Sequence, residues 1–216
     1  GYAARPGRPP PPAAHGRDRA GAGTGPVRPA RDRRSRARGH APQAVVDGPD
    51  GRRILSRMNH WLIKSEPDVF SIHDLAKAKH KTTHWEGVRN YQARNFLRAM
   101  KKGDLALYYH SNAEPSAVAG IVEVVREAYP DATAWDPRSD YHDRKASPEN
   151  PLWSMVDVKL VEVFPREVPL EELRGVKALA GMELLRRGSR LSVHPVTAAE
   201  FRTIRTLASK RPANGP

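Results

Sequence analysis

The sequence predicts an α+β fold in which a mostly antiparallel sheet curls into a small barrel surrounded by short helices. The expected elements follow the order β, α, α, β, β, β, α, α, β, α, which lacks the regular βαβ alternation of a doubly wound fold. Clear hydrophobic patterning begins only at Met58. The 216 residues include no Cys and no apolar run near the ~18 residues of a membrane span, so neither disulfides nor membrane contact is expected.

Residues 1–57 differ in composition from the rest, with nine Pro, nine Gly and a single aromatic residue, Tyr2. Thirteen Arg against four Asp give this segment +9 of the total +13, whereas residues 58–216 carry 24 Lys and Arg against 20 acids, or +4. Such a segment cannot bury enough apolar surface to offset its conformational entropy, so we expect a disordered leader. It is either a basic arm that adds non-specific nucleic-acid affinity or an upstream translation with Met58 as the true start, and the second interpretation is favoured. The folded domain is expected over 58–210, followed by a tail at 211–216.

The expected helices are introduced by capping boxes, by Pro near the first turn, or by apolar side chains at helical spacing. The clearest capping boxes are Ser71 with Asp74 and Thr197 with Glu200. The predicted helices and helical turns cover residues 71–79, 91–101, 169–173, 182–187 and 197–207.

The expected strands are short apolar runs bounded by turn signals. They cover residues 60–64, 105–110, 117–127, 153–164 and 190–193. Residues 82–90 are expected to form a polar loop. A second loop, 129–151, is rich in Asp, Pro and Ser, and loops of that length are uncommon in a compact domain unless they bind something or cover a site.

Several chemistries lack support. The chain has no G-x-G-x-x-G or Walker loop, no H-E-x-x-H pair and no G-x-S-x-G elbow, so we predict no cofactor, no metal and no catalytic serine. His73, His80 and His84 lie near one another, but without acid or thiolate partners at ligand spacing they are a weak metal signal. The net +4 of residues 58–216 tolerates a phosphate backbone without requiring one.

The positive evidence comes from aromatic residues beside polar ones. Trp61, Trp85 and Trp153 each lie at the edge of an expected element next to Ser, Lys, Arg or Asn. A base taken out of its stack is held between aromatic faces and hydrogen-bonded along its polar edge, which needs both kinds of group together. Each Trp taken alone is more simply a core residue with a satisfied N–H, so the shared polar neighbours carry the base-binding hypothesis.

Residues 85–95 concentrate Arg and Asn just before an expected helix N-terminus, where backbone N–H groups and the helix dipole favour anions. Arg and Asn are also the side chains best suited to base edges and phosphates. Structural alternatives are a salt bridge between Arg94 and Glu86, and a simple turn at Asn112 before Pro115.

Six motifs together resemble the EVE domain, in particular the thymocyte nuclear protein group and its bacterial relatives. They are HWLIKSEP at 60–67, WEGVRNYQARN at 85–95, YHSN at 109–112, AGI at 119–121, EAYPD at 127–131 and WSMVDV at 153–158. The resemblance runs from about His60 to Leu207, and the Arg-rich leader has no counterpart in it. It implies a PUA-like fold related to YTH, ASCH and SRA domains. It further implies a non-catalytic module that encloses a modified base, expected to be a modified cytosine, in DNA or RNA.

Carried over to this sequence, the resemblance assigns one set of side chains to the base and another to phosphate. The expected base-binding residues are Trp61, Lys64, Ser65, Glu66, Trp85, Arg89, Asn90, Tyr91, His110, Ser111, Asn112, Trp153 and Ser154. The expected phosphate contacts are Arg94 and Arg190.

Two other functions remain open. One is a hydrolase or glycosylase acting on a modified nucleotide, with Glu66 or His110 as acid or base. The other is a sensor that binds a free base or another small ligand in the same aromatic pocket. We expect a monomer in the cytoplasm, associated with the nucleoid in a bacterium and located in the nucleus in a eukaryote.

Overall fold

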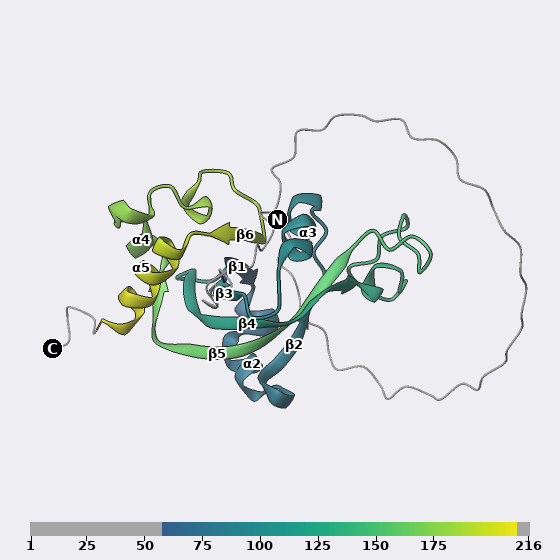
Figure 1. The fold of residues 1–216 in the computed structure, drawn as a ribbon, viewed down its shortest axis with the longest axis horizontal. Helices are drawn as coiled ribbons and strands as arrows, with labels where there is room; N and C mark the ends of the chain where they lie inside the picture. Colours follow the sequence, from purple (N-terminus) through teal and green to yellow (C-terminus); the bar gives the residue numbers. More distant parts are fainter. Residues whose placement is uncertain (1–57, 211–216) are drawn as a thin grey trace, which may run out of the picture. The chain divides into compact units, whose positions relative to one another are not determined.

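The computed structural model describes residues 58–210, so the predicted leader at 1–57 and the tail at 211–216 lie outside the described residues. The described chain forms one six-stranded sheet in the order β2-β5-β4-β3-β1-β6 (Figure 1). The strands are β1 His60–Ser65, β2 Thr82–Trp85, β3 Leu105–His110, β4 Ala117–Pro130, β5 Ser154–Pro169 and β6 Val193–Val196. Only the β1–β3 pair is parallel. The predicted α+β class and mostly antiparallel sheet are confirmed, but the barrel is not closed, because β2 and β6 are the two edges of the sheet.

Short helices surround this sheet. They are α1 Pro67–Phe70, α2 Ile72–Lys77, α3 Tyr91–Ala99, α4 Leu170–Arg174 and α5 Ala198–Ser209. Four 3-10 turns complete the described chain: η1 Lys79–Lys81, η2 Ala132–Ala134, η3 Lys177–Leu179 and η4 Glu183–Leu185. Both predicted capping boxes are confirmed, with Ser71 at the start of α2 and Thr197 at the start of α5.

Several expected elements differ from the structure in kind or in extent. The polar loop predicted at 82–90 begins with β2, an edge strand held by antiparallel pairing with residues 156–159 of β5. Strand β4 extends beyond its predicted end to Pro130, which pairs with Ser154 at the start of β5, so the long loop covers 131–153. Strand β5 continues to Pro169, past its predicted end at residue 164. The helical turn predicted at 182–187 is the single 3-10 turn η4, and the last strand begins at Val193 instead of residue 190.

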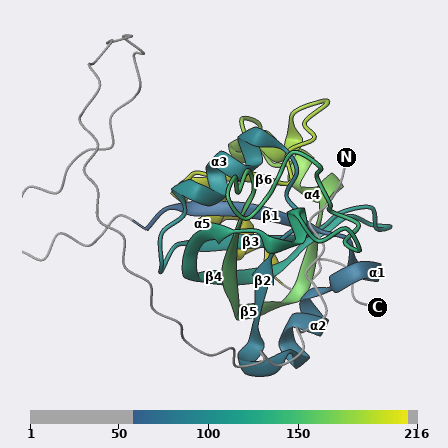
Figure 2. The same cartoon turned by 90° about the vertical axis from the view of Figure 1, so that its right-hand side faces the viewer.

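The sheet has a hydrophobic core on each of its two faces, because successive side chains along a strand point to opposite faces. The α2–α3 core contains Trp61, Trp85 and Tyr108, and the α4–α5 core contains Leu62 and Tyr109. Figure 1 shows α4 and α5 on the opposite side of the strands from α3, and Figure 2 shows α2 below the β2 and β5 strands. Neighbouring residues of one strand therefore belong to different cores.

His194 on β6 is a completely buried titratable group in this framework. Its Nδ1 lies 3.3 Å from the carbonyl oxygen of Pro195, which can only accept, so Nδ1 carries the proton. Among the described residues, Nε2 has no hydrogen-bond partner. Burial lowers the pKa of His194 from 6.5 to about 4, so the folded protein holds this ring neutral.

Because His194 is neutral in the folded protein, we expect the free energy of unfolding to fall in acid. Between pH 6.5 and about 4 the unfolded chain binds a proton at this residue and the folded chain does not, so stability falls as the pH drops through that window. The expected loss from this residue is roughly 3 kcal/mol. Denaturant unfolding at pH 7.5 and pH 4.5 measures it, and His194→Asn, which keeps a donor near Nδ1, should lose less stability than wild type. Equal losses in both proteins would contradict this account.

Candidate nucleic-acid interface

Two of the predicted base-binding rings, Trp61 and Trp85, lie in the α2–α3 core. Trp61 is 6% exposed and its Nε1 donates to Asp104 Oδ2 at 2.9 Å. Trp85 is completely buried and meets the Tyr108 ring edge-on, with 5.4 Å between centroids. Neither ring offers an open face, so a base could stack on them only after the core opened. Both rings therefore lie in the core, but only Trp61 has the satisfied N–H of the simpler alternative, because among the described residues Trp85 Nε1 has no hydrogen-bond partner.

A first group of predicted residues meets at the ends of two neighbouring strands. We call Ser65, Glu66, His110, Ser111 and Asn112 the β1–β3 end. The Ser111 N–H donates to the Ser65 carbonyl at 2.8 Å, and Asn112 Nδ2 donates to Glu66 Oε1 at 2.8 Å. Because β1 and β3 are parallel, their carboxyl ends coincide, which brings these polar side chains together.

His110 within this group has both ring nitrogens engaged. The Ile72 N–H donates to its Nε2 at 3.1 Å, and its Nδ1 lies 3.1 Å from Glu167 Oε1. Burial lowers the pKa of His110, and the charge of Glu167 opposes that shift. A neutral ring with its proton on Nδ1 satisfies both contacts. His110 thus attaches the start of α2 to the sheet, an arrangement that does not favour a catalytic acid or base.

Lys64 is separated from its predicted partner Ser65 by strand alternation. Its Nζ lies 5.9 Å from the centre of the Tyr109 ring, on the face of the α4–α5 core. Burial lowers the pKa of the Lys64 ammonium. Ser65 is completely buried on the other face, where its hydroxyl donates to the Phe70 carbonyl at 2.8 Å. The two side chains therefore do not line one pocket, which corrects the sequence-based grouping.

A second group forms at the start of α3. We call Tyr91, Arg94 and Trp153 the α3 platform. The Tyr91 and Trp153 rings stack with centroids 4.9 Å apart at 28°, and the Arg94 guanidinium lies 4.8 Å from the Tyr91 centroid. Tyr91 is 54% exposed, whereas Trp153 is only 4% exposed. Asn90 accepts from the Gln92 and Ala93 N–H groups and so acts as the N-cap of α3. An open aromatic ring with a cation beside it at a helix N-terminus suits a nucleobase and its phosphate.

Arg89 serves this platform as a structural tie. Its Nη1 donates to Asp131 Oδ2 at 2.7 Å, its Nη2 to Thr133 Oγ1 at 3.0 Å and its Nε to the Tyr141 carbonyl at 2.7 Å. The guanidinium also lies 5.6 Å from the centres of the Tyr141 and Trp153 rings. These donors are used within the protein, so Arg89 holds the 131–153 loop rather than presenting a free edge to a base.

Asp131 and Tyr141 were not predicted as site residues, although Asp131 ends the EAYPD motif. Asp131 is completely buried and also accepts from the Gly87 N–H at 3.0 Å. Gly87 has a φ of +77°, and a Cβ there would lie 2.8 Å from the Tyr141 ring. Only glycine permits this close approach between the 86–90 segment and the loop. The acid just after a strand and the glycine four residues before Tyr91 are the sequence signals for this contact.

Ser154 and Arg190, the remaining predicted residues, have different surroundings. Ser154 is buried, and its Oγ accepts from Arg98 Nε at 2.9 Å beside the α3 platform. Arg190 is exposed between η4 and β6, and within residues 58–210 no hydrogen bond or ion pair joins it to either group.

The histidines considered for metal binding are arranged differently from a metal site. His84 Nε2 lies 3.2 Å from Glu86 Oε2, and that contact raises the pKa of His84. His73 and His80 are exposed. No three His, Asp or Glu residues within 58–210 are grouped so as to hold a metal ion. In the same described range, no helix is both long and apolar enough to cross a membrane.

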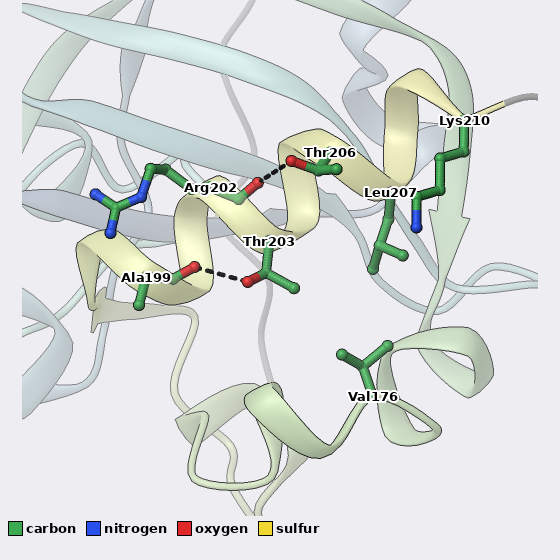
Figure 3. A pocket seen from close by; sticks show the side chains of 7 residues that line it. All are labelled: Val176, Ala199, Arg202, Thr203, Thr206, Leu207 and Lys210. Atoms are coloured by element: carbon green, nitrogen blue, oxygen red, sulfur yellow. Dashed lines mark hydrogen bonds between the residues drawn. The ribbon is translucent and has the colours of Figure 1, made fainter.

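A cavity of about 670 Å³ lies between α5 and Val176 (Figure 3). The Thr203 hydroxyl donates to the Ala199 carbonyl at 2.8 Å, and the Thr206 hydroxyl donates to the Arg202 carbonyl at 2.9 Å. The wall of this cavity therefore presents mainly aliphatic groups and no aromatic face, which does not suit base recognition.

Comparison with known proteins gives consistent relatives. The family described as "EVE domain" matches residues 59–207. "Thymocyte nuclear protein 1" of Gallus gallus is 46% identical over 170 residues, which cover 71% of this chain and 70% of that protein. The protein of the same name from Homo sapiens is 44% identical over 172 residues, covering 72% of this chain and 76% of that protein.

Solved structures show the same likeness. The human THYN1 protein in complex with 5-methylcytosine-containing DNA is 44% identical with a TM-score of 0.69, covering 71% of this chain and 99% of that chain. A protein from Pseudomonas putida is 49% identical with a TM-score of 0.67, covering 69% of this chain and 99% of that chain.

The Arg89 tie predicts a stability effect. Arg89→Met leaves the completely buried Asp131 carboxylate without its cation, so the free energy of unfolding should fall by roughly 3 kcal/mol. Adding Asp131→Asn should cost less than the sum of the two single changes, because the unpaired charge is gone. As a control, Lys101→Gln breaks the exposed pair with Glu127 and should leave stability unchanged. Denaturant unfolding measures all four variants, and wild-type stability of Arg89→Met would contradict the role of the tie.

Proposed function

The chain belongs to the EVE domain family, and from this we propose that it is a non-catalytic DNA-binding module that recognises a modified cytosine. The observation that carries the proposal is the likeness, across 99% of that chain, to the human protein whose structure contains 5-methylcytosine DNA. In a eukaryotic cell we expect the protein to act in the nucleus, in keeping with the name of its relatives.

The α3 platform supports this function chemically. A base taken from its stack needs an aromatic surface, and Tyr91 is the ring of the platform with an open surface. Arg94 beside it supplies a charge for the neighbouring phosphate. We therefore assign the stacking role to Tyr91, supported from beneath by Trp153.

The β1–β3 end is a candidate for reading the polar edge of the base. A carboxylate accepts well from the exocyclic amine of cytosine, and Glu66 is a partly exposed carboxylate held by Asn112. Glu66 belongs to the β1–β3 end and Tyr91 to the α3 platform, so substituting each residue separately distinguishes its contribution to DNA binding.

The binding proposal is tested with the full chain and labelled oligonucleotides that carry cytosine, 5-methylcytosine or 5-hydroxymethylcytosine, as DNA and as RNA, at one salt concentration. We expect the tightest binding to one modified DNA. Tyr91→Ala should weaken that binding by about 5- to 150-fold, since stacking contributes roughly 1–3 kcal/mol per base. Tyr91→Phe should retain it, and Val161→Ala, which trims an equally exposed apolar residue on β5, should have no effect.

Other results would overturn parts of this proposal. Equal, weak and salt-sensitive binding to every oligonucleotide would reject recognition of modified cytosine. Free 5-methylcytidine bound as tightly as the oligonucleotide would indicate a small-molecule sensor. Mass spectrometry of the digested oligonucleotide after incubation shows whether the modified base has been converted. Such a conversion would indicate an enzyme.

A further inference from the structure

A row of basic side chains continues from the α3 platform along the same helix. Arg94 and Arg98 are four residues apart in α3, so they lie one above the other on one face. Lys101 follows just after the helix ends at Ala99. Tyr91 and Arg98 are separated by about 10 Å of helix at 1.5 Å per residue, which is about three times the ~3.4 Å axial spacing of phosphates along one DNA strand.

This row borders a groove. A cavity of about 430 Å³ lies between the end of α3, with Arg98 and Lys101, and the end of β4, with Tyr129 and Pro130. The rest of the groove wall is formed by Pro151 near the end of the long loop, by Ser154 at the start of β5, and by Glu127 and Ala128.

The two arginines are held in place before any ligand arrives. Arg94 Nη1 and Arg98 Nη2 both donate to the Leu152 carbonyl, at 2.9 and 3.3 Å, and Arg98 Nε donates to Ser154 Oγ at 2.9 Å. Two like charges are thereby kept close together, and burial with the charge of Arg94 lowers the pKa of Arg98. An anion beside them relieves this repulsion. Ser154 accepts from Arg98, so its own hydroxyl proton can be donated to an anionic oxygen.

The lining of the groove suits a phosphate better than a base. Tyr129 is its only aromatic residue among those described, and the Arg126 guanidinium already lies 3.6 Å from the centre of that ring. The Tyr129 hydroxyl donates to Asp157 Oδ1 at 2.6 Å. The single acid in the lining, Glu127, lies 2.8 Å from Lys101, and both side chains are exposed. The groove with Arg94 therefore keeps an excess of positive charge.

We infer that this α3 groove, lined by Arg98, Lys101 and Ser154 and adjoined by Arg94, holds the sugar–phosphate backbone of the DNA whose base stacks on Tyr91. The inference rests on the proposed function and adds the path of the strand to it. Arg98 and Lys101 each neutralise a phosphate, and Glu127 competes with the phosphate for Lys101.

The test uses Arg98→Gln and Lys101→Gln in the full chain, with modified and unmodified DNA over a series of salt concentrations. Each variant should bind both DNAs about tenfold more weakly at low salt, and the ratio between the two DNAs should stay the same, since phosphate contacts carry no sequence information. The slope of log affinity against log salt should fall by about 0.9 per lost phosphate contact. Arg202→Gln on α5 removes the same charge outside the groove and should change neither quantity.

Glu127→Gln supplies a result of opposite sign. Removing the carboxylate frees Lys101 for the phosphate, so both DNAs should bind several-fold more tightly. A purely structural role for the Lys101–Glu127 pair would leave the affinity unchanged or lower it. Arg98→Lys keeps the charge and should retain most of the salt slope, and thermal melting confirms that each variant is folded.

The outcomes separate this inference from the proposed function. If wild type shows no preference for modified DNA, the proposed function fails whatever the variants do. If wild type keeps its preference while Arg98→Gln and Lys101→Gln keep wild-type affinity and salt slope, only the groove inference fails. A selective loss of affinity for modified DNA would place these residues at the base and would also overturn the inference. The Lys101 ammonium donates to Glu127 on β4, and within residues 58–210 it has no hydrogen bond to the long loop, so its variant remains informative even if Arg98→Gln unfolds.

Discussion

A buried carboxylate, Asp131, determines where the proposed DNA-binding surface of this protein forms. It has no exposed surface, so its charge has to be met by protein donors, and the Gly87 N–H, Arg89 and Thr133 supply them. These donors come from the segment before α3 and from the long loop, which the carboxylate therefore joins. The joined loop then returns through Leu152 and Trp153, which support Arg94, Arg98 and Tyr91 of α3. Both the aromatic platform and the basic groove depend on this one buried charge.

The second constraint is the alternation of side chains along β1 and β3. It separates Lys64 from Ser65 and Tyr108 from Tyr109, although each pair is adjacent in sequence. A sequence motif groups residues by their order in the chain, whereas a sheet groups them by face. The HWLIKSEP motif consequently contributes to two cores and to the β1–β3 end, and most of its side chains stabilise the fold.

The local elements could be predicted from sequence to the extent that their causes are local. Ser71 and Thr197 predict their helices because the capping partner lies three residues away, and β3 is bounded by a turn before it and by bends after it. Strand β2 could not be predicted in the same way, because Thr82 to Trp85 is polar on one side and is held by β5, more than seventy residues later. The site divides similarly. Tyr91 and Arg94 follow from the helix start, but the stack of Tyr91 on Trp153 and the tie from Arg89 to Asp131 are long-range contacts that no local pattern specifies.

The distribution of charge explains why a local groove matters for a domain of this composition. Residues 58–216 carry a net charge of only +4, with 24 basic against 20 acidic residues, so the field of the whole domain attracts DNA weakly. Affinity for phosphates then depends on a few cations held close together, and their fixed position avoids the entropy cost of ordering long side chains on binding. The Leu152 carbonyl and Ser154 provide that fixation for Arg94 and Arg98. Because Trp153 beneath Tyr91 belongs to the same segment, the proposed positions of the stacked base and of the backbone are coupled through residues 152–154. In the proposed complex, specificity for the base and affinity for the strand thus use different side chains that depend on one short segment.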